Sequence, residues 1–230
     1  MSDLPQPPSA ALAGPLVSRC RAYLKHLLLD GGLDPGDLVP IQTIAAALGV
    51  SRQPVMEAVR LLGAEEFIDV TAQVGCRVVM PVPGELSDFF ALFARAEAQI
   101  VAHAAERRTA EEALALSNDA AAIDARSVQL IETHYRGPEY RGLNRRLHEQ
   151  VHAMARTPVA SGIVMGLWDR SDFYMRVAFG GVYFTRAVVA GHRAIVAAVV
   201  EGRPRAAEDA TLEHLRAAGA LAVAQLQRQA

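Results

Sequence analysis

Apolar residues recur at helical spacing over most of the chain, and strand-like stretches are confined to one short region. The first third contains an apolar stripe from Leu16 to Leu27, the run Ile41 to Leu48, and a helical segment from Ser51 to Leu62. The stretches 67–70 and 77–80 flank a turn at Gly75 and predict two strands. Three helices followed by a two-stranded wing predict a winged helix-turn-helix.

The second and third of these helices are separated by the tight sequence Gly49-Val50-Ser51. Ser51 is expected to be an N-cap, with its hydroxyl accepting from an N–H of the first helical turn. Pro54 fits in that turn because the N–H it lacks would have no intrahelical partner. A helix of this size fits the major groove of DNA, so the segment is expected to lie against bases.

Helical periodicity continues beyond Pro81-Val82-Pro83-Gly84, which is a natural linker. One such stripe is formed by Phe89, Leu92, Phe93, Ala96, Ile100 and Ala104. Breaks at Pro138, at Pro158, at Gly180-Gly181 and from Gly202 to Pro204 predict helices near 85–107, 109–126, 139–156, 158–178, 184–201 and 204–228. The expected fold is therefore mainly α: a flexible arm (1–13), an N-terminal winged helix-turn-helix (14–80), a linker (81–84) and a C-terminal all-α helical bundle of about six helices (85–230).

Composition and charge narrow this picture. The chain has 230 residues, a formal net charge of −2 and 51% hydrophobic residues, which suits one or two soluble domains. The start shows no export signal and no run approaches about 18 uncharged apolar residues, so a cytoplasmic protein is expected. Cys20 and Cys76 have no paired spacing and are expected to be small buried thiols. Residues 1–80 hold six Lys/Arg against eight Asp/Glu, so DNA affinity would need a dimer and a few well-placed contacts.

The first domain resembles the GntR family of bacterial transcription regulators. That family typically reads G-x-L-x-P-G, then L-G-V-S-R-x-P-V-R-E-A-L-x-x-L, then a wing with a glycine. This chain matches at Gly32, Leu33, Pro35, Gly36, Leu48, Gly49, Val50, Ser51, Arg52, Pro54, Val55, Glu57, Ala58, Leu62 and Gly75. We expect DNA contacts from Ser51, Arg52, Gln53, Met56, Arg60, Gly75 and Arg77.

Met56 departs from this pattern, because the family usually has arginine after Pro-Val. That arginine is a common DNA contact in the family. An Arg fork to guanine contributes about 1–3 kcal/mol of discrimination between bases, so an altered base preference or weaker binding is expected.

Three histidines lie on separate helices of the predicted bundle: His148, His192 and His214. Imidazoles that converge from separate helices are a usual way for a bundle to hold zinc or nickel, although a lone helical histidine is more often a bystander. The chain here resembles the FCD effector domain of a large GntR branch, with the pattern D-x-x-x-H, H-x-x-I-x-x-A-[IV]-x-x-G and H-L. It reads Asn144-Arg-Arg-Leu-His148, then His192 to Gly202, then His214-Leu215. About six helices resemble the shorter, VanR-type branch.

The FCD resemblance implies a divalent metal, zinc or nickel, at His148, His192, His214 and Asn144, and a small carboxylate effector beside it. Asn144 replaces the customary aspartate; it shares a helix face with His148, but a neutral amide oxygen is a poorer partner for a cation. Two alternatives stay open: the pocket binds an effector without metal, or the histidines are structural.

Two arginines are candidates for gripping the effector. Arg95 lies on the family pattern R-x-x-L-E, and a guanidinium inside a pocket suits a planar anion. Arg176, near Phe173 and Tyr174, is the second candidate. The alternatives are an exposed surface arginine at 95 and ordinary core packing around 176.

A rival interpretation comes from residues 148–152, which spell H-E-x-x-H, the helical signature of zinc metalloproteases. The glycine of the extended motif is missing and strand signals are absent around this helix. The favoured hypothesis is a non-enzymatic, homodimeric transcription regulator, in this family more often a repressor, on a pseudo-palindromic operator. A small organic acid or related metabolite in the bundle would shift operator affinity, with a typical coupling of about 1–3 kcal/mol. A third possibility is a DNA-binding protein whose bundle is purely structural.

Overall fold

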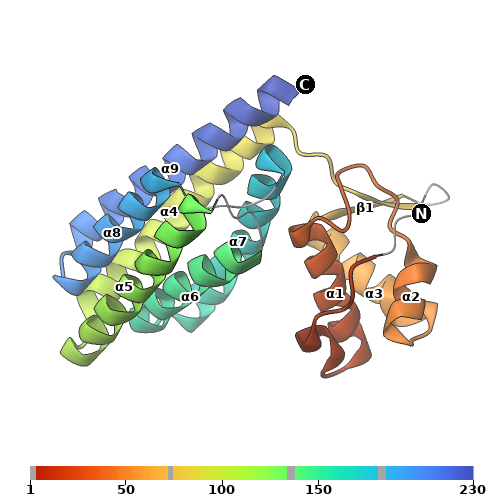
Figure 1. Cartoon of the computed structure of the whole chain (residues 1–230), viewed down its shortest axis with the longest axis horizontal. Coiled ribbons are helices and arrows are strands. Elements are labelled where there is room, and N and C mark those ends of the chain that lie inside the picture. Colours follow the sequence, from red (N-terminus) through yellow and green to blue (C-terminus); the bar gives the residue numbers. More distant parts are fainter. Residues whose placement is uncertain (1–3, 72–74, 134–137, 181–184, 230) are drawn as a thin grey trace. The chain divides into compact units, whose positions relative to one another are not determined.

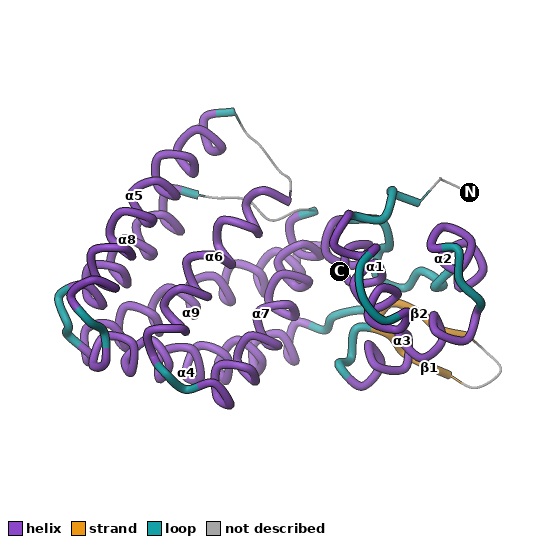
Figure 2. Tube along the Cα trace, turned by 90° about the horizontal axis from the view of Figure 1, so that it is seen from below, coloured by secondary structure: helices purple, strands orange, loops and turns teal. Residues whose placement is uncertain are grey.

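The computed structural model describes residues 4–71, 75–133, 138–180 and 185–229, and the chain divides into two compact units, 1–81 and 82–230. Helices dominate both units, and the described strands form a single pair (Figure 2). The predicted mainly α fold class is confirmed. Gly181, expected at a helix break, lies outside the described residues.

The first unit is a winged helix-turn-helix. Its elements are α1 (Leu16–Asp30), α2 (Ile41–Leu48), α3 (Arg52–Ala64), β1 (Ile68–Thr71) and β2 (Gly75–Val78). The strands pair antiparallel, with Ile68 opposite Val78. The turn after α2 needs Gly49, whose φ of 64° is a left-handed conformation that few other residues adopt.

One apolar face of each helix builds the core of this unit. The wholly buried residues include Tyr23, Leu24 and Leu27 of α1, Ile44 of α2, and Val55, Val59 and Leu62 of α3. Cys20 is buried and Cys76 is half-buried, and both are thiols without a disulfide. Because one face of α3 packs in this core, its opposite face is available to contact a partner.

Part of the stretch expected to be a flexible arm contacts α1. Residues Ser9–Leu12 form a 3₁₀ helix, η1, and the Tyr23 hydroxyl donates a hydrogen bond to the Pro5 carbonyl at 2.5 Å. The buried Tyr23 therefore finds its polar partner in this segment.

The second unit is a helical bundle (Figure 1). Its helices are α4 (Pro83–Arg107), α5 (Ala110–Glu132), α6 (Pro138–Ala155), α7 (Pro158–Phe179), α8 (Arg186–Val200) and α9 (Pro204–Gln229). α4 and α9 lie side by side along much of their length, and α4 also packs on α6, α7 and α8. No helix among the described residues has both the length and the apolar character needed to span a bilayer.

Three sequence expectations for the bundle need correction. α4 begins at Pro83, so two residues of the expected linker form its first turn, where proline is tolerated. α5 runs to Glu132 because Leu130 packs with Tyr140 and Val189 in a small apolar cluster. The apolar stripe expected on α4 is correct at Phe93, Ile100 and Ala104, which are buried, but Leu92 is 65% exposed, and the buried face also includes Phe90, Glu97 and Val101.

Candidate functional site

The predicted DNA-contacting residues lie on the accessible side of the first unit. Ser51, Arg52, Gln53 and Arg60 are exposed and Met56 is half-buried, on the face of α3 opposite its core face. Gly75 and Arg77 are exposed on β2, and the Arg77 guanidinium donates to the Gly36 carbonyl at 2.8 Å. The placement agrees with the expectation, and the contacts themselves stay a prediction.

Ser51 stands at the N-cap of α3 in an extended conformation, but its side chain makes no capping hydrogen bond. Ser51 therefore occupies the expected N-cap position, but the expected capping hydrogen bond is absent. Serine caps accept from the N–H of the second or third helical residue, and the third residue here is Pro54, which has no N–H.

Positive charge near α3 is limited. Arg21 and Lys25 of α1 both bind the Glu65 carboxylate, at 2.7 and 2.9 Å. The basic side chains that α3 itself presents are Arg52 and Arg60. DNA binding by this unit is therefore expected to depend on local contacts more than on a broad positive field.

In the bundle, the structure brings the three predicted histidines together. The ring centres of His148 and His192 are 5.6 Å apart, and those of His192 and His214 are 4.7 Å apart. His148 and His192 are buried and His214 is half-buried. Asn144, one turn before His148 on α6, is buried as well.

Gly191 makes room for the third ring. A Cβ placed on Gly191 would lie 2.3 Å from Nδ1 of His214, far inside ordinary contact distance. The His214 ring therefore packs directly against the backbone of α8, beside His192.

Glu97, which sequence reasoning missed, lies next to this cluster and is wholly buried. Its carboxylate is 2.9 Å from Nδ1 of His148 and 2.8 Å from Nε2 of His152, and it accepts from the Trp168 indole at 3.0 Å. The sequence feature that could have revealed Glu97 is a single charged residue on the apolar face of α4. Burial acts to raise the pKa of Glu97, but the hydrogen bonds and charges of His148 and His152 outweigh it and lower that pKa to about 2.

The other two imidazoles favour their neutral form. Burial, together with the neighbouring His148, lowers the pKa of His214 to about 4. Burial and the charges of His214 and His148 hold the pKa of His192 well below its usual value. Neutral imidazole is the form that accepts a hydrogen bond or binds a metal.

The donor types fit a borderline divalent metal. Three imidazoles on a tetrahedral zinc would hold their ring centres roughly 5 Å apart, close to the spacings seen here. The Asn144 Oδ1 and His148 Nε2 atoms are buried and find no hydrogen-bond partner among the described residues. Within that part of the chain, however, no three His, Cys, Asp or Glu side chains are gathered closely enough to ligate one ion. The residue types and their proximity to one another suit a metal, and ligation of a metal stays a proposal.

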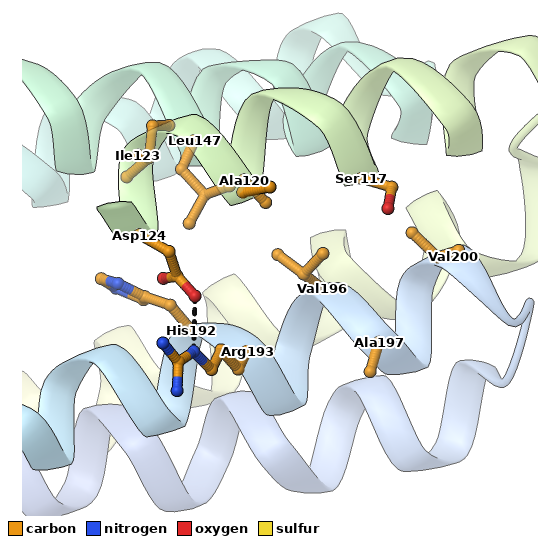
Figure 3. Close-up of a pocket in the computed structure, with 11 residues that line it drawn as sticks. Ser117, Ala120, Ile123, Asp124, Leu147, His192, Arg193, Val196, Ala197 and Val200 are labelled. Atoms are coloured by element: carbon orange, nitrogen blue, oxygen red, sulfur yellow. Dashed lines mark hydrogen bonds and ion pairs between the residues drawn. The ribbon is translucent and has the colours of Figure 1, made fainter. Parts of the chain in front are cut away.

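Two cavities adjoin the histidines. One, of about 270 Å³, lies between α5 and α8, where His192 is at one end and Asp124 faces Arg193 across the gap (Figure 3). The other, of about 250 Å³, is mostly apolar and includes Asn144 and His214 in its wall. Its remaining lining residues include Tyr140, Trp168, Ser171, Asp172, Met175, Phe179, Thr185 and Leu215.

The two predicted effector arginines are placed differently. Arg95 is exposed on α4 and is not part of the wall of either cavity. Arg176 is buried on α7, one helical turn from Asp172, which lines the second cavity. Neither position by itself indicates that the arginine binds an anion, so the effector-binding roles of both arginines stay predictions.

The H-E-x-x-H at 148–152 is not built as a protease site. His148 and His152 both face Glu97, while Glu149 is exposed and binds Arg145 at 3.1 Å. A zincin needs the two histidines on a metal and the motif's glutamate on its water.

A winged DNA-binding unit joined to a helical unit with a polar cluster beside a cavity defines a two-domain transcription regulator. The chain belongs to the GntR family of bacterial regulatory proteins, which residues 16–78 match, and residues 88–217 match the FCD domain. Proteins of these families are DNA-binding transcription regulators and not enzymes, and their FCD domains often bind a metal or a small effector. The protease interpretation is therefore wrong.

Individual proteins are also similar to this chain. The chain is 29% identical over 202 residues to an uncharacterized HTH-type transcriptional regulator in an unstable DNA locus of Streptomyces ambofaciens, a match covering 84% of this chain and 79% of that protein. Escherichia coli McbR/YncC has a similar fold, with a TM-score of 0.76 and 20% identity over 94% of this chain and 99% of that one. A putative regulator GntR from Rhodococcus sp. RHA1 gives 0.70 and 17% over 90% and 97%.

Proposed function

We propose that this protein is a metabolite-responsive repressor that binds a pseudo-palindromic operator as a homodimer in the cytoplasm. The observation that carries the proposal is the union, in one chain, of an accessible recognition helix and a buried histidine cluster bordering a cavity. A single α3 offers few side chains to base edges, and its domain has little positive charge. Two copies on two half-sites would supply the missing affinity and specificity.

The effector site is the apolar cavity that Asn144 and His214 border. Its volume suits a small organic molecule, and its polar groups are few, as is typical of sites that orient a ligand within apolar walls. A small organic acid is the favoured ligand class. Its carboxylate would be held at the histidine end, and Arg176 is the nearer of the two predicted arginines to this cavity.

A divalent metal, zinc or nickel, would be held by His148, His192 and His214, with Asn144 as a weak oxygen donor. When bound, it would supply a positive charge for an anionic ligand. The low pKa values of His192 and His214 support this assignment, because neutral imidazoles bind metals without first losing a proton. A VanR-like subtype is consistent with a bundle of this size.

Regulation would follow from a population shift. An effector that binds one arrangement of the dimer better than another changes operator affinity by that difference, typically about 1–3 kcal/mol. The chain's own residues contribute by holding the ligand between α6, α7, α8 and α9, the helices that line the cavity.

The test is a gel-shift titration on the DNA upstream of the protein's own gene, repeated with candidate carboxylates and after chelation. A retarded complex that a carboxylate weakens is expected, and size-exclusion chromatography with light scattering should give a dimer. Failure to bind any DNA selected from a random pool would contradict the regulator function. Carboxylate response that survives chelation would favour the second candidate, an effector pocket without metal, which the neutral Asn144 supports. A complex that no metabolite alters would favour a purely structural bundle.

A further inference from the structure

Glu97 occupies an unusual position for a charged side chain. It has no exposed surface, and donors from two other helices surround it: His148 and His152 of α6 and Trp168 of α7. A buried carboxylate is costly unless each oxygen is hydrogen-bonded. Both oxygens of Glu97 meet that condition, since Oε1 faces His148 while Oε2 faces His152 and Trp168.

This arrangement selects one tautomer of His148. An ionised carboxylate only accepts hydrogen bonds, so Nδ1 of His148, 2.9 Å from Oε1, must carry the proton. When the ring is neutral, as a metal ligand must be, the lone pair then lies on Nε2. That atom is buried and has no hydrogen-bond partner among the described residues, and its ring lies beside that of His192.

Asn144 adds a second lone pair without a charge. Its Oδ1 is likewise buried without a partner in the described part of the chain, and it lies one turn from His148 on α6. The buried carboxylate beside this cluster is Glu97, which reaches it through Nδ1 of His148.

We propose that Glu97 is a positioning residue: it fixes the Nε2 lone pair of His148 toward the histidine cluster and supplies the buried negative charge that Asn144 lacks. The inference rests on the proposed function, in which these histidines hold a divalent cation. A carboxylate behind a ligating histidine orients the ring and makes its free nitrogen more basic, and its loss typically lowers metal affinity about 10–100-fold.

His152 and Trp168 complete the device by fixing the carboxylate. Both bind Oε2, so Oε1 is left in place for His148. Trp168 also packs on the His148 ring, with ring centres 4.0 Å apart, which restricts its rotation.

The first experiment measures Co²⁺ and Zn²⁺ binding to the full-length protein by visible absorption and calorimetry. Glu97→Gln keeps the size of the side chain and removes its charge, so it should weaken binding about 10–100-fold. Glu149→Gln is the matched control, because it removes the same charge from an exposed residue directly beside His148 on α6. It should leave affinity unchanged. Asn144→Asp should strengthen metal binding. The gain in affinity should be larger in the Glu97→Gln background, because the new carboxylate there replaces the charge that Glu97→Gln removed.

The second experiment reads the His148 tautomer by ¹⁵N NMR of the metal-free wild-type protein, and it stands even where Glu97→Gln does not fold. A proton on Nδ1, with Nε2 unprotonated, is expected. A proton on Nε2 would overturn the inference, as would a folded Glu97→Gln protein that binds Co²⁺ as tightly as wild type. A wild-type protein that binds neither metal, with His148 still protonated on Nδ1, would instead refute the metal in the proposed function and, with it, the charge-supplying role of Glu97.

Discussion

Gly191 is the position at which a single methyl group should disturb the histidine cluster most directly. A Cβ there would lie 2.3 Å from Nδ1 and 3.1 Å from Cγ of His214. Ordinary contact begins near 3.4 Å, so in Gly191→Ala the His214 ring has to move by about 1 Å in a closely packed interior. Overpacking of this kind costs about 1–3 kcal/mol. The higher helix propensity of alanine offsets about 0.5–1 kcal/mol of this cost, so a net loss of stability of up to about 2.5 kcal/mol is expected.

Two other glycines provide comparison variants for this prediction. Gly166 lies within α7, and a Cβ there meets nothing within 4 Å, so Gly166→Ala should stabilise the protein by about 0.5–1 kcal/mol. Gly219 of α9 faces Phe90 of α4, and its added Cβ would lie 2.5 Å from the Phe90 Cβ. Gly219→Ala should therefore cost stability as Gly191→Ala does, but its clash involves an aromatic core residue in place of a histidine.

The assay combines urea unfolding with Co²⁺ titration. Gly191→Ala should lose both stability and Co²⁺ affinity, Gly219→Ala should lose stability with little change in affinity, and Gly166→Ala should lose neither. The midpoint should move without a change in the urea dependence, as expected for a packing effect. If Gly191→Ala gains stability like Gly166→Ala and binds Co²⁺ as wild type does, His214 does not pack against Gly191 and the proposed cluster is refuted.

Three further outcomes are expected. Arg52→Ala should weaken operator binding by about 1–3 kcal/mol in a fluorescence-anisotropy titration, and unchanged binding would remove Arg52 from the interface. Met56→Arg, which restores the usual family residue, should change the preferred base at one position by a similar energy in competition gel shifts, whereas an identical preference would show that this side chain reads no base. In the metal-free protein, His192 and His214 have folded-state pKa values below the usual 6.5, for His214 about 4, so the unfolded chain binds more protons between these values. Its free energy of unfolding should therefore fall as the pH is lowered from 6.5 toward 4, by at most about 1.4 kcal/mol per pH unit for each imidazole, and urea midpoints that stay constant across this window would contradict the burial of both rings.

The Ser51 cap and the α4 stripe show where reasoning from local sequence fails. Serine before a helix predicts a cap, but Pro54 removes one of the two N–H groups that could donate to it. The α4 stripe is correct at Phe93, Ile100 and Ala104 but includes the exposed Leu92 and leaves out the buried Phe90. Apolar and small residues occur all round this helix, so periodicity alone does not distinguish Phe90 from Leu92. Only the packing of α9, α6 and α7 against α4 decides which face is buried.

The sequence by itself determined the order and type of the helices, the wing, the exposed face of the recognition helix and the residue types of the histidine cluster. These depend on short-range rules: helical period, turn glycines, and prolines at the first position of a helix. The tertiary structure alone decided that Glu97 of α4 meets His148 and His152 of α6, and that Gly191 admits the His214 ring. Such contacts join residues far apart in the chain, and they depend on how the helices are rotated and set against each other, which no local pattern encodes.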